Sequence, residues 1–144
     1  MRSPALDRLE WLIGEWRLTM TNAFFLDSLQ EEVIGEASFK WLDDALVVFR
    51  WSLGPTPPNV CVIGYSTPQE QYHMLYHDDR GVARIFSMEY DEDHWSLLRE
   101  DSDFYQRFVA NLEADRIIGS WEASEDEGET WRTDFDLTFH RLTR

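Results

Sequence analysis

The end of the chain alternates apolar and polar residues. From Trp131 to Arg141, most residues at odd positions are apolar, and the residues at even positions are polar or charged. A repeat of two is typical of a β-strand with one buried face. Near the start, Trp16, Leu18 and Met20 share one face of a similar run. The pattern therefore predicts a strand at each end of the chain, with Trp16 facing inward and Arg141 ending an inward row.

Similar segments fill the space between these two strands. The ten predicted strands span residues 15–22, 31–41, 45–53, 60–66, 71–77, 82–90, 94–100, 104–112, 116–123 and 130–141. The breaks between them are rich in Asp, Gly and Pro and are short, which favours antiparallel neighbours. A flat sheet of this size would leave an apolar face uncovered, whereas closure buries that face and removes the edges. We therefore predict an all-β fold, a closed antiparallel meander barrel forming one domain over residues 1–144.

A short helix precedes the first strand. Apolar residues follow Pro4 at helical spacing, and Gly14 ends the run, so we expect a short lid over the barrel. Inside the barrel, Gly35 and Ala37 are small. Because ten strands enclose a wider lumen than eight, we expect a cavity.

Aromatic and polar side chains on the predicted inner faces are the candidate ligand contacts. They are Tyr72, Tyr76, Arg84, Trp95, Gln106 and Trp131. A guanidinium such as that of Arg84, facing an aromatic interior, needs a carboxylate, a phosphate or hydrogen-bonded tyrosines to offset its desolvation. Since one β-bulge reverses the face of every later residue, a solvent-facing Arg84 is the alternative.

Composition limits the choice of partners. The 144 residues include 28 acids and carry a net charge of −15, which disfavours nucleic acid and anionic membranes. Cys61 is the only cysteine, so the chain has no internal disulfide. With no signal-like segment and no apolar stretch of membrane-spanning length, we expect a cytoplasmic protein.

Catalytic and metal motifs are weak. His73 and His77 would lie about 13 Å apart along a strand, too far to hold one metal, so we expect none. No serine or cysteine stands in a nucleophile motif. Residues 124–131 resemble a single Asp-box of sialidases, which we interpret as a turn that ties the last hairpin.

Two resemblances add to this picture. Gly14-Glu15-Trp16 together with Arg141 resembles the lipocalin arrangement, in which the arginine lies across the tryptophan ring in a structural role. Residues 9–141, notably Leu12–Trp16, 75–84 and 134–141, resemble a bacterial lipocalin-like family of the calycin superfamily, of unknown function and sometimes labelled fatty-acid-binding-like. That resemblance implies the fold and no activity.

A more distant resemblance is to the nitrobindins, ten-stranded barrels that hold haem through a histidine near the C-terminus. This chain lacks their glycine-rich first strand, and His140 lies on the face opposite Arg141. The residues therefore give haem no support, and we expect no cofactor.

Three functions remain open. The first is binding of a small, mostly apolar ligand, with an anionic group directed at Arg84. The second is an enzyme in the same cavity, with Tyr76 or a histidine as general acid or base. The third is a packed structural domain without a ligand. A homo-oligomer is compatible with all three.

Overall fold

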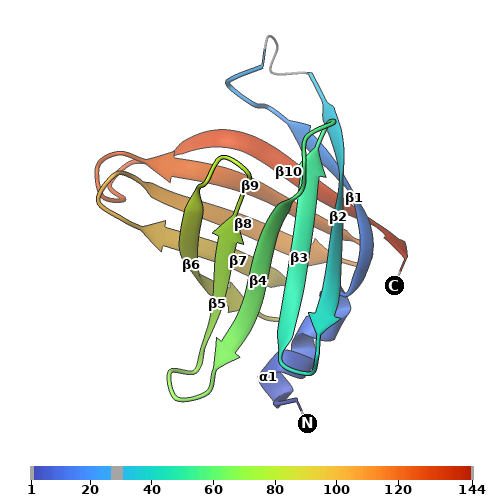
Figure 1. The fold of residues 1–144 in the computed structure, drawn as a ribbon. Coiled ribbons are helices and arrows are strands. Elements are labelled where there is room, and N and C mark those ends of the chain that lie inside the picture. The colour runs from blue at the N-terminus through green and yellow to red at the C-terminus, as the bar shows by residue number, and fades with distance from the viewer. Residues whose placement is uncertain (1, 27–30, 144) are drawn as a thin grey trace.

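The protein folds as a closed antiparallel barrel of ten strands (Figure 1). The computed structural model describes residues 2–26 and 31–143. The strands are β1 (Gly14–Thr21), β2 (Val33–Leu42), β3 (Leu46–Leu53), β4 (Asn59–Ser66), β5 (Gln71–His77), β6 (Ala83–Tyr90), β7 (His94–Glu100), β8 (Tyr105–Glu113), β9 (Arg116–Ser124) and β10 (Arg132–Thr143). Each pairs with its sequence neighbour, and β1 also pairs with β10 to close the barrel. The predicted fold class is confirmed, with small shifts in strand ends.

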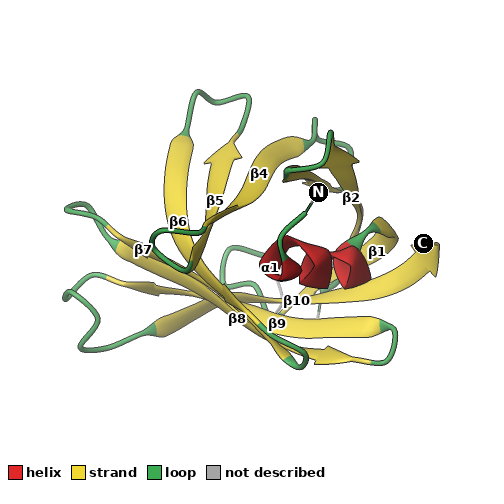
Figure 2. Cartoon of the chain, turned by 90° about the horizontal axis from the view of Figure 1, so that it is seen from below, coloured by secondary structure: helices red, strands yellow, loops and turns green. Residues whose placement is uncertain are grey.

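A short helical segment lies at one end of the barrel (Figure 2). It consists of α1 (Pro4–Asp7) and the 3-10 helix η1 (Arg8–Leu12), capped by Ser3, whose hydroxyl oxygen accepts from the Leu6 amide at 3.3 Å. Leu9 and Leu12 of η1 are fully buried. Within the described residues, no helix is long and apolar enough to cross a membrane.

The middle of the barrel is filled by aromatic rings. Phe39 and Phe49 stack with centroids 4.3 Å apart. Trp95 reaches them from the far side of the barrel, with its centroid 6.0 Å from each ring. Phe108 and Phe139 complete the cluster, 5.2 and 6.0 Å from Trp95. The prediction of a cavity is therefore wrong for the middle of the barrel, because rings from opposite strands meet there.

The small inward residues do not leave open space. A Cβ added at Gly119 would lie 2.6 Å from the Phe108 ring, so the glycine makes room for that ring. A Cβ at Gly35 would lie 2.0 Å from the Ser52 carbonyl oxygen on the neighbouring strand. Both glycines permit close packing, which the alternation of residues alone did not reveal.

Candidate functional site

The helical segment and the last strand close one end of the barrel around Trp16. Trp16 is fully buried, and its Nε1 donates to the Leu12 carbonyl oxygen at 2.8 Å. The Arg141 guanidinium lies 4.2 Å from the Trp16 centroid, and its Nη2 donates to the Trp11 carbonyl oxygen at 2.6 Å. This is the stacking that the resemblance to lipocalins implied.

Tyr72 belongs to the same closed end. Its hydroxyl donates to the Ala5 carbonyl oxygen, and its side chain is 6% exposed. Tyr76 lies on the same inward face of β5 but four residues further along, about 13 Å away. The structure therefore separates the two tyrosines that the sequence placed in one site.

Three of the predicted contacts come together at the open end. Arg84 on β6 is paired directly with Tyr76 on β5, and its guanidinium lies 5.8 Å from the Tyr76 ring centroid. From β8, the side-chain oxygen of Gln106 accepts a hydrogen bond from Arg84 Nη1 at 3.1 Å. The sequence pattern placed these three residues on the inner faces of β5, β6 and β8, and the structure shows them close together.

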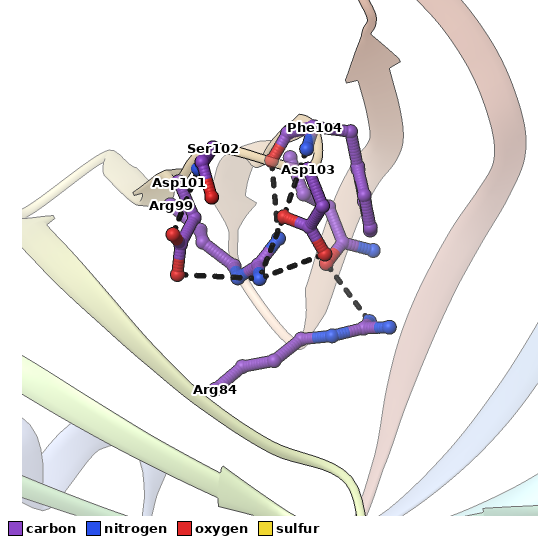
Figure 3. Close-up of polar contacts among 7 residues, drawn as sticks. Arg84, Arg99, Asp101, Ser102, Asp103 and Phe104 are labelled. Carbon is purple, nitrogen blue, oxygen red and sulfur yellow. Dashed lines mark hydrogen bonds and ion pairs between the residues drawn. The ribbon is translucent and has the colours of Figure 1, made fainter.

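The turn between β7 and β8 borders this cluster (Figure 3). Arg99 is 9% exposed, pairs with Asp101 and Asp103, and donates to the Phe104 carbonyl oxygen at 3.0 Å. The Phe104 ring lies near two guanidinium groups, 4.9 Å from that of Arg99 and 5.4 Å from that of Arg84. The ion pairs of Arg99 thus hold the turn against the mouth of the barrel.

A hollow of about 360 Å³ lies at this mouth. Four phenylalanines contribute to its lining: Phe24, Phe25, Phe104 and Phe135. Phe24 and Phe25 are 61% and 55% exposed, and Phe25 meets Phe135 edge to face at 6.1 Å. The volume falls within the range typical of small-molecule sites.

Arg84 differs from the other arginines around the hollow. Arg80 pairs with Asp78, Arg132 pairs with Glu125 and Asp134, and Arg99 pairs with two aspartates, as noted above. Among the described residues, Arg84 has no carboxylate within ion-pair distance, and its hydrogen-bond partner is the neutral Gln106. In a chain with 28 acids, a positive group with a neutral partner at a hollow is suited to an anion.

Tyr76 is held as a hydrogen-bond donor. Its hydroxyl donates to Asp78 Oδ2 at 2.7 Å, and burial together with this carboxylate raises the pKa of Tyr76 to about 12. Hydrogen bonds from Arg80 keep the pKa of the Asp78 carboxyl below its usual range. Tyr76 therefore stays protonated near neutral pH, which makes it a poor general base there.

The other two predicted contacts lie elsewhere. Trp95 sits in the aromatic cluster at the middle of the barrel and is 1% exposed. Trp131 precedes β10 and packs on the outer face, 3.9 Å from the guanidinium of Arg107. The expected inward position of Trp131 is wrong because the pairing of β10 with β9 shifts between Thr133 and Phe135. Trp131 borders an outer groove of about 530 Å³, which is lined by side chains of β5 to β8 and by the turn that contains Glu127 and Gly128.

Residues 124–131 form the predicted turn. Ser124 Oγ donates to Asp126 Oδ1 at 2.7 Å and accepts from the Gly128 amide at 2.9 Å. Trp131 Nε1 donates to the Gly128 carbonyl oxygen at 3.1 Å. All these hydrogen bonds join residues within the turn, so the Asp-box-like segment stabilises the hairpin between β9 and β10.

The histidines do not face the lumen. His73, His77, His94 and His140 alternate with the inward residues of their strands and point outward. Burial and the nearby Arg17 and Arg116 lower the pKa of His140. A haem held through an inward histidine does not fit these positions. Within the described residues, no group of three or more His, Cys, Asp and Glu side chains could hold a metal ion.

The sequence pattern missed the aromatic rim of the hollow. Phe24 and Phe25 lie in the segment between β1 and β2, where no strand alternation assigns a face. The sequence did contain one indication of this rim: two adjacent phenylalanines in a connecting segment are costly to expose unless they pack against something.

Comparison with known proteins supports the fold. No family model matches the chain, and no curated protein matches it. Among solved structures, Rv2717c from M. tuberculosis is similar, with a TM-score of 0.67 and 12% sequence identity over 99% of each chain. At that identity the likeness shows the fold alone and supports the closed antiparallel barrel.

Proposed function

We propose that this protein binds a small amphipathic anion at the open mouth of its barrel. The anionic group of the ligand lies against Arg84, and its apolar part lies against Phe25, Phe104 and Phe135. The observation that carries the proposal is the position of Arg84 at an aromatic-lined hollow with a neutral hydrogen-bond partner. A carboxylate, sulfonate or phosphate there gains a charge-assisted hydrogen bond.

The local charge balance supports an anion. The lining contains three arginines, Arg80, Arg84 and Arg132, against three acids, Asp103, Glu125 and Asp134. The chain as a whole has 28 acids against 13 bases. An approaching anion is therefore repelled less at the mouth than over the average surface.

The filled middle of the barrel limits how the ligand is held. Aromatic rings occupy the level of Trp95, so the ligand lies in the mouth and not deep in the lumen. Resemblance to fatty-acid-binding-like proteins is consistent with an amphipathic ligand, although a long chain would extend outward past Phe24 and Phe25. The same filling favours a packed domain without a ligand as the second candidate.

Two naphthalene dyes test the proposal directly. 8-Anilino-1-naphthalenesulfonate carries a sulfonate, whereas N-phenyl-1-naphthylamine has a similar ring system and no charge. We expect the sulfonate dye to bind more tightly, because only the sulfonate can accept a charge-assisted hydrogen bond from Arg84. Equal affinity for both dyes, or no binding of either, would reject the anion site. Native mass spectrometry of freshly purified protein would then show whether a cellular ligand is retained.

A further inference from the structure

The outward positions of four neighbouring strands are almost free of acidic side chains. Strands β3 to β6 lie side by side on the near side of the barrel in Figure 1. Their outward side chains, which alternate with the buried ones, include one acid, Glu89, near the end of β6. The chain has 28 acids in total, so their near absence from these four strands is a marked departure. We call these outward side chains the acid-poor face.

An apolar row crosses the centre of this face. Val48, Val62, Leu75 and Ile85 are direct partners in register across the four strands. Leu75 is 42% exposed and Ile85 is 67% exposed. Val48 and Val62 are half-buried. Apolar side chains that meet in one solvent-facing row are typical of an interaction surface, whereas isolated ones are ordinary.

We propose that two copies of this chain associate through their acid-poor faces. Each copy carries a charge of −15, so contacts through most other surfaces would bring carboxylates together. Face-to-face contact of the acid-poor faces joins apolar rows and keeps Glu89 toward the edge. A second copy is therefore the occupant whose charge distribution this face fits.

The size of the face sets the strength of the contact. Four strands spaced about 4.8 Å apart and about seven residues long cover roughly 19 Å by 23 Å, or about 440 Å² on each copy. Two such faces bury about 880 Å² in total, which is below the about 1,200–2,000 Å² of stable specific interfaces and in the range of weak, transient ones. The dimer should therefore be weak and dependent on concentration, with a dissociation constant of about micromolar or above.

For the dimer we propose a two-fold axis parallel to the strands, which sets the pairing within the row. It places Val48 of one copy opposite Ile85 of the other, and Val62 opposite Leu75, because symmetric contacts are reciprocal. This register predicts which pairs of substitutions compensate for each other.

Sedimentation velocity over a wide range of protein concentration tests the association. We expect a shift from monomer to dimer as concentration rises. Added sodium chloride should strengthen the dimer by screening the net repulsion between the acidic copies. A monomer at every concentration and salt level would overturn the proposal, as would a dimer that salt dissociates.

Substitutions locate the interface. Ile85→Glu should weaken the dimer by about tenfold or more, because a carboxylate would be buried against an apolar partner. The matched control is Ile118→Glu on β9, an outward isoleucine that is 37% exposed on the opposite side of the barrel. It should leave association unchanged. Circular dichroism should confirm that both variants retain the fold.

A mixture of two variants tests the register. Val48→Lys alone should also weaken the homodimer, but an equimolar mixture with Ile85→Glu should form a heterodimer. In that heterodimer one opposed pair becomes Lys and Glu, and the other remains Val and Ile. A mixture that stays monomeric while each variant remains folded would reject this register. Weakening by Ile118→Glu and not by Ile85→Glu would reject the face itself.

Discussion

The Arg141 guanidinium covers the Trp16 ring, 4.2 Å from its centroid, and joins the last strand of the barrel to the first. The two residues are also register partners of β10 and β1, beside a register shift at Glu15. The same guanidinium donates to the Trp11 carbonyl oxygen, so it links the helical segment to the strands that close the barrel. Three parts of the chain depend on one stacked pair.

Removal of the Trp16 ring should therefore be costly. We expect Trp16→Ala to lower the free energy of unfolding by about 3–5 kcal/mol, because the ring is fully buried and its loss leaves a cavity. Urea unfolding followed by circular dichroism measures the change. A loss below about 1 kcal/mol would contradict the closing role. Met20→Ala is the comparison variant, because it shortens a buried apolar side chain on the same strand but outside the stacked pair.

The packed middle of the barrel makes Gly119 sensitive to enlargement. A methyl group there would meet the Phe108 ring at 2.6 Å and the Ala110 Cβ at 2.9 Å. Gly119→Ala should destabilise the protein by about 1–3 kcal/mol through overpacking. Thermal and urea unfolding measure this cost.

Gly64→Ala is the control for Gly119. An added methyl group at Gly64, a strand glycine on the outer face, would meet the end of the flexible Leu46 side chain at 3.0 Å. That side chain can move, so the cost should be smaller. If both substitutions lowered the free energy of unfolding equally little, the lumen would be more open than the packing of the aromatic cluster implies.

The candidate site shows what alternation can and cannot predict. It assigns a face, so Tyr76, Arg84 and Gln106 were correctly placed on the inner wall. It does not assign height along the barrel, so Tyr72 was grouped with residues at the other end. It also says nothing of side chains that cross the lumen, which is why Trp95 was taken as a lining residue and is instead packed.

Bulges and connections account for the remaining differences. The register shift between Thr133 and Phe135 separates Trp131 from the inner face of β10. A sequence contains little warning of a single extra residue in a strand. The connection carrying Phe24 and Phe25 has no strand periodicity, so its position at the mouth depends on packing against Phe135.

Acid should loosen the hairpin between β9 and β10 through Asp126. Hydrogen bonds from the Thr130 hydroxyl and amide and from the Ser124 hydroxyl lower the pKa of Asp126 from 3.8 to about 2. Because the folded pKa is depressed, this contribution is fully present above about pH 4 and is lost as the pH falls towards 2. Urea unfolding between about pH 5 and pH 2 should therefore show a smaller acid loss for Asp126→Asn than for the parent.

Glu127→Gln provides the comparison within the same turn. In the part of the chain that the structure describes, the turn's hydrogen bonds go to Asp126, Ser124 and Gly128 and none goes to the Glu127 carboxylate, so this variant leaves them in place. Titration of the Asp126 carboxyl carbon by NMR gives a direct check. A midpoint near 3.8, the ordinary value, would mean that the turn does not stabilise the ionised form.

Arg84→Gln tests the function, since it removes the charge and retains a polar side chain. We expect the affinity for 8-anilino-1-naphthalenesulfonate to fall by about tenfold, which corresponds to about 1.4 kcal/mol for a charge-assisted hydrogen bond in a partly exposed site. The affinity for uncharged N-phenyl-1-naphthylamine should stay the same, because the phenylalanines remain. Arg107→Gln is the matched control, as Arg107 lies on the outer groove beside Trp131. If that variant loses the sulfonate dye and Arg84→Gln does not, the outer groove is the anion site and the mouth is not.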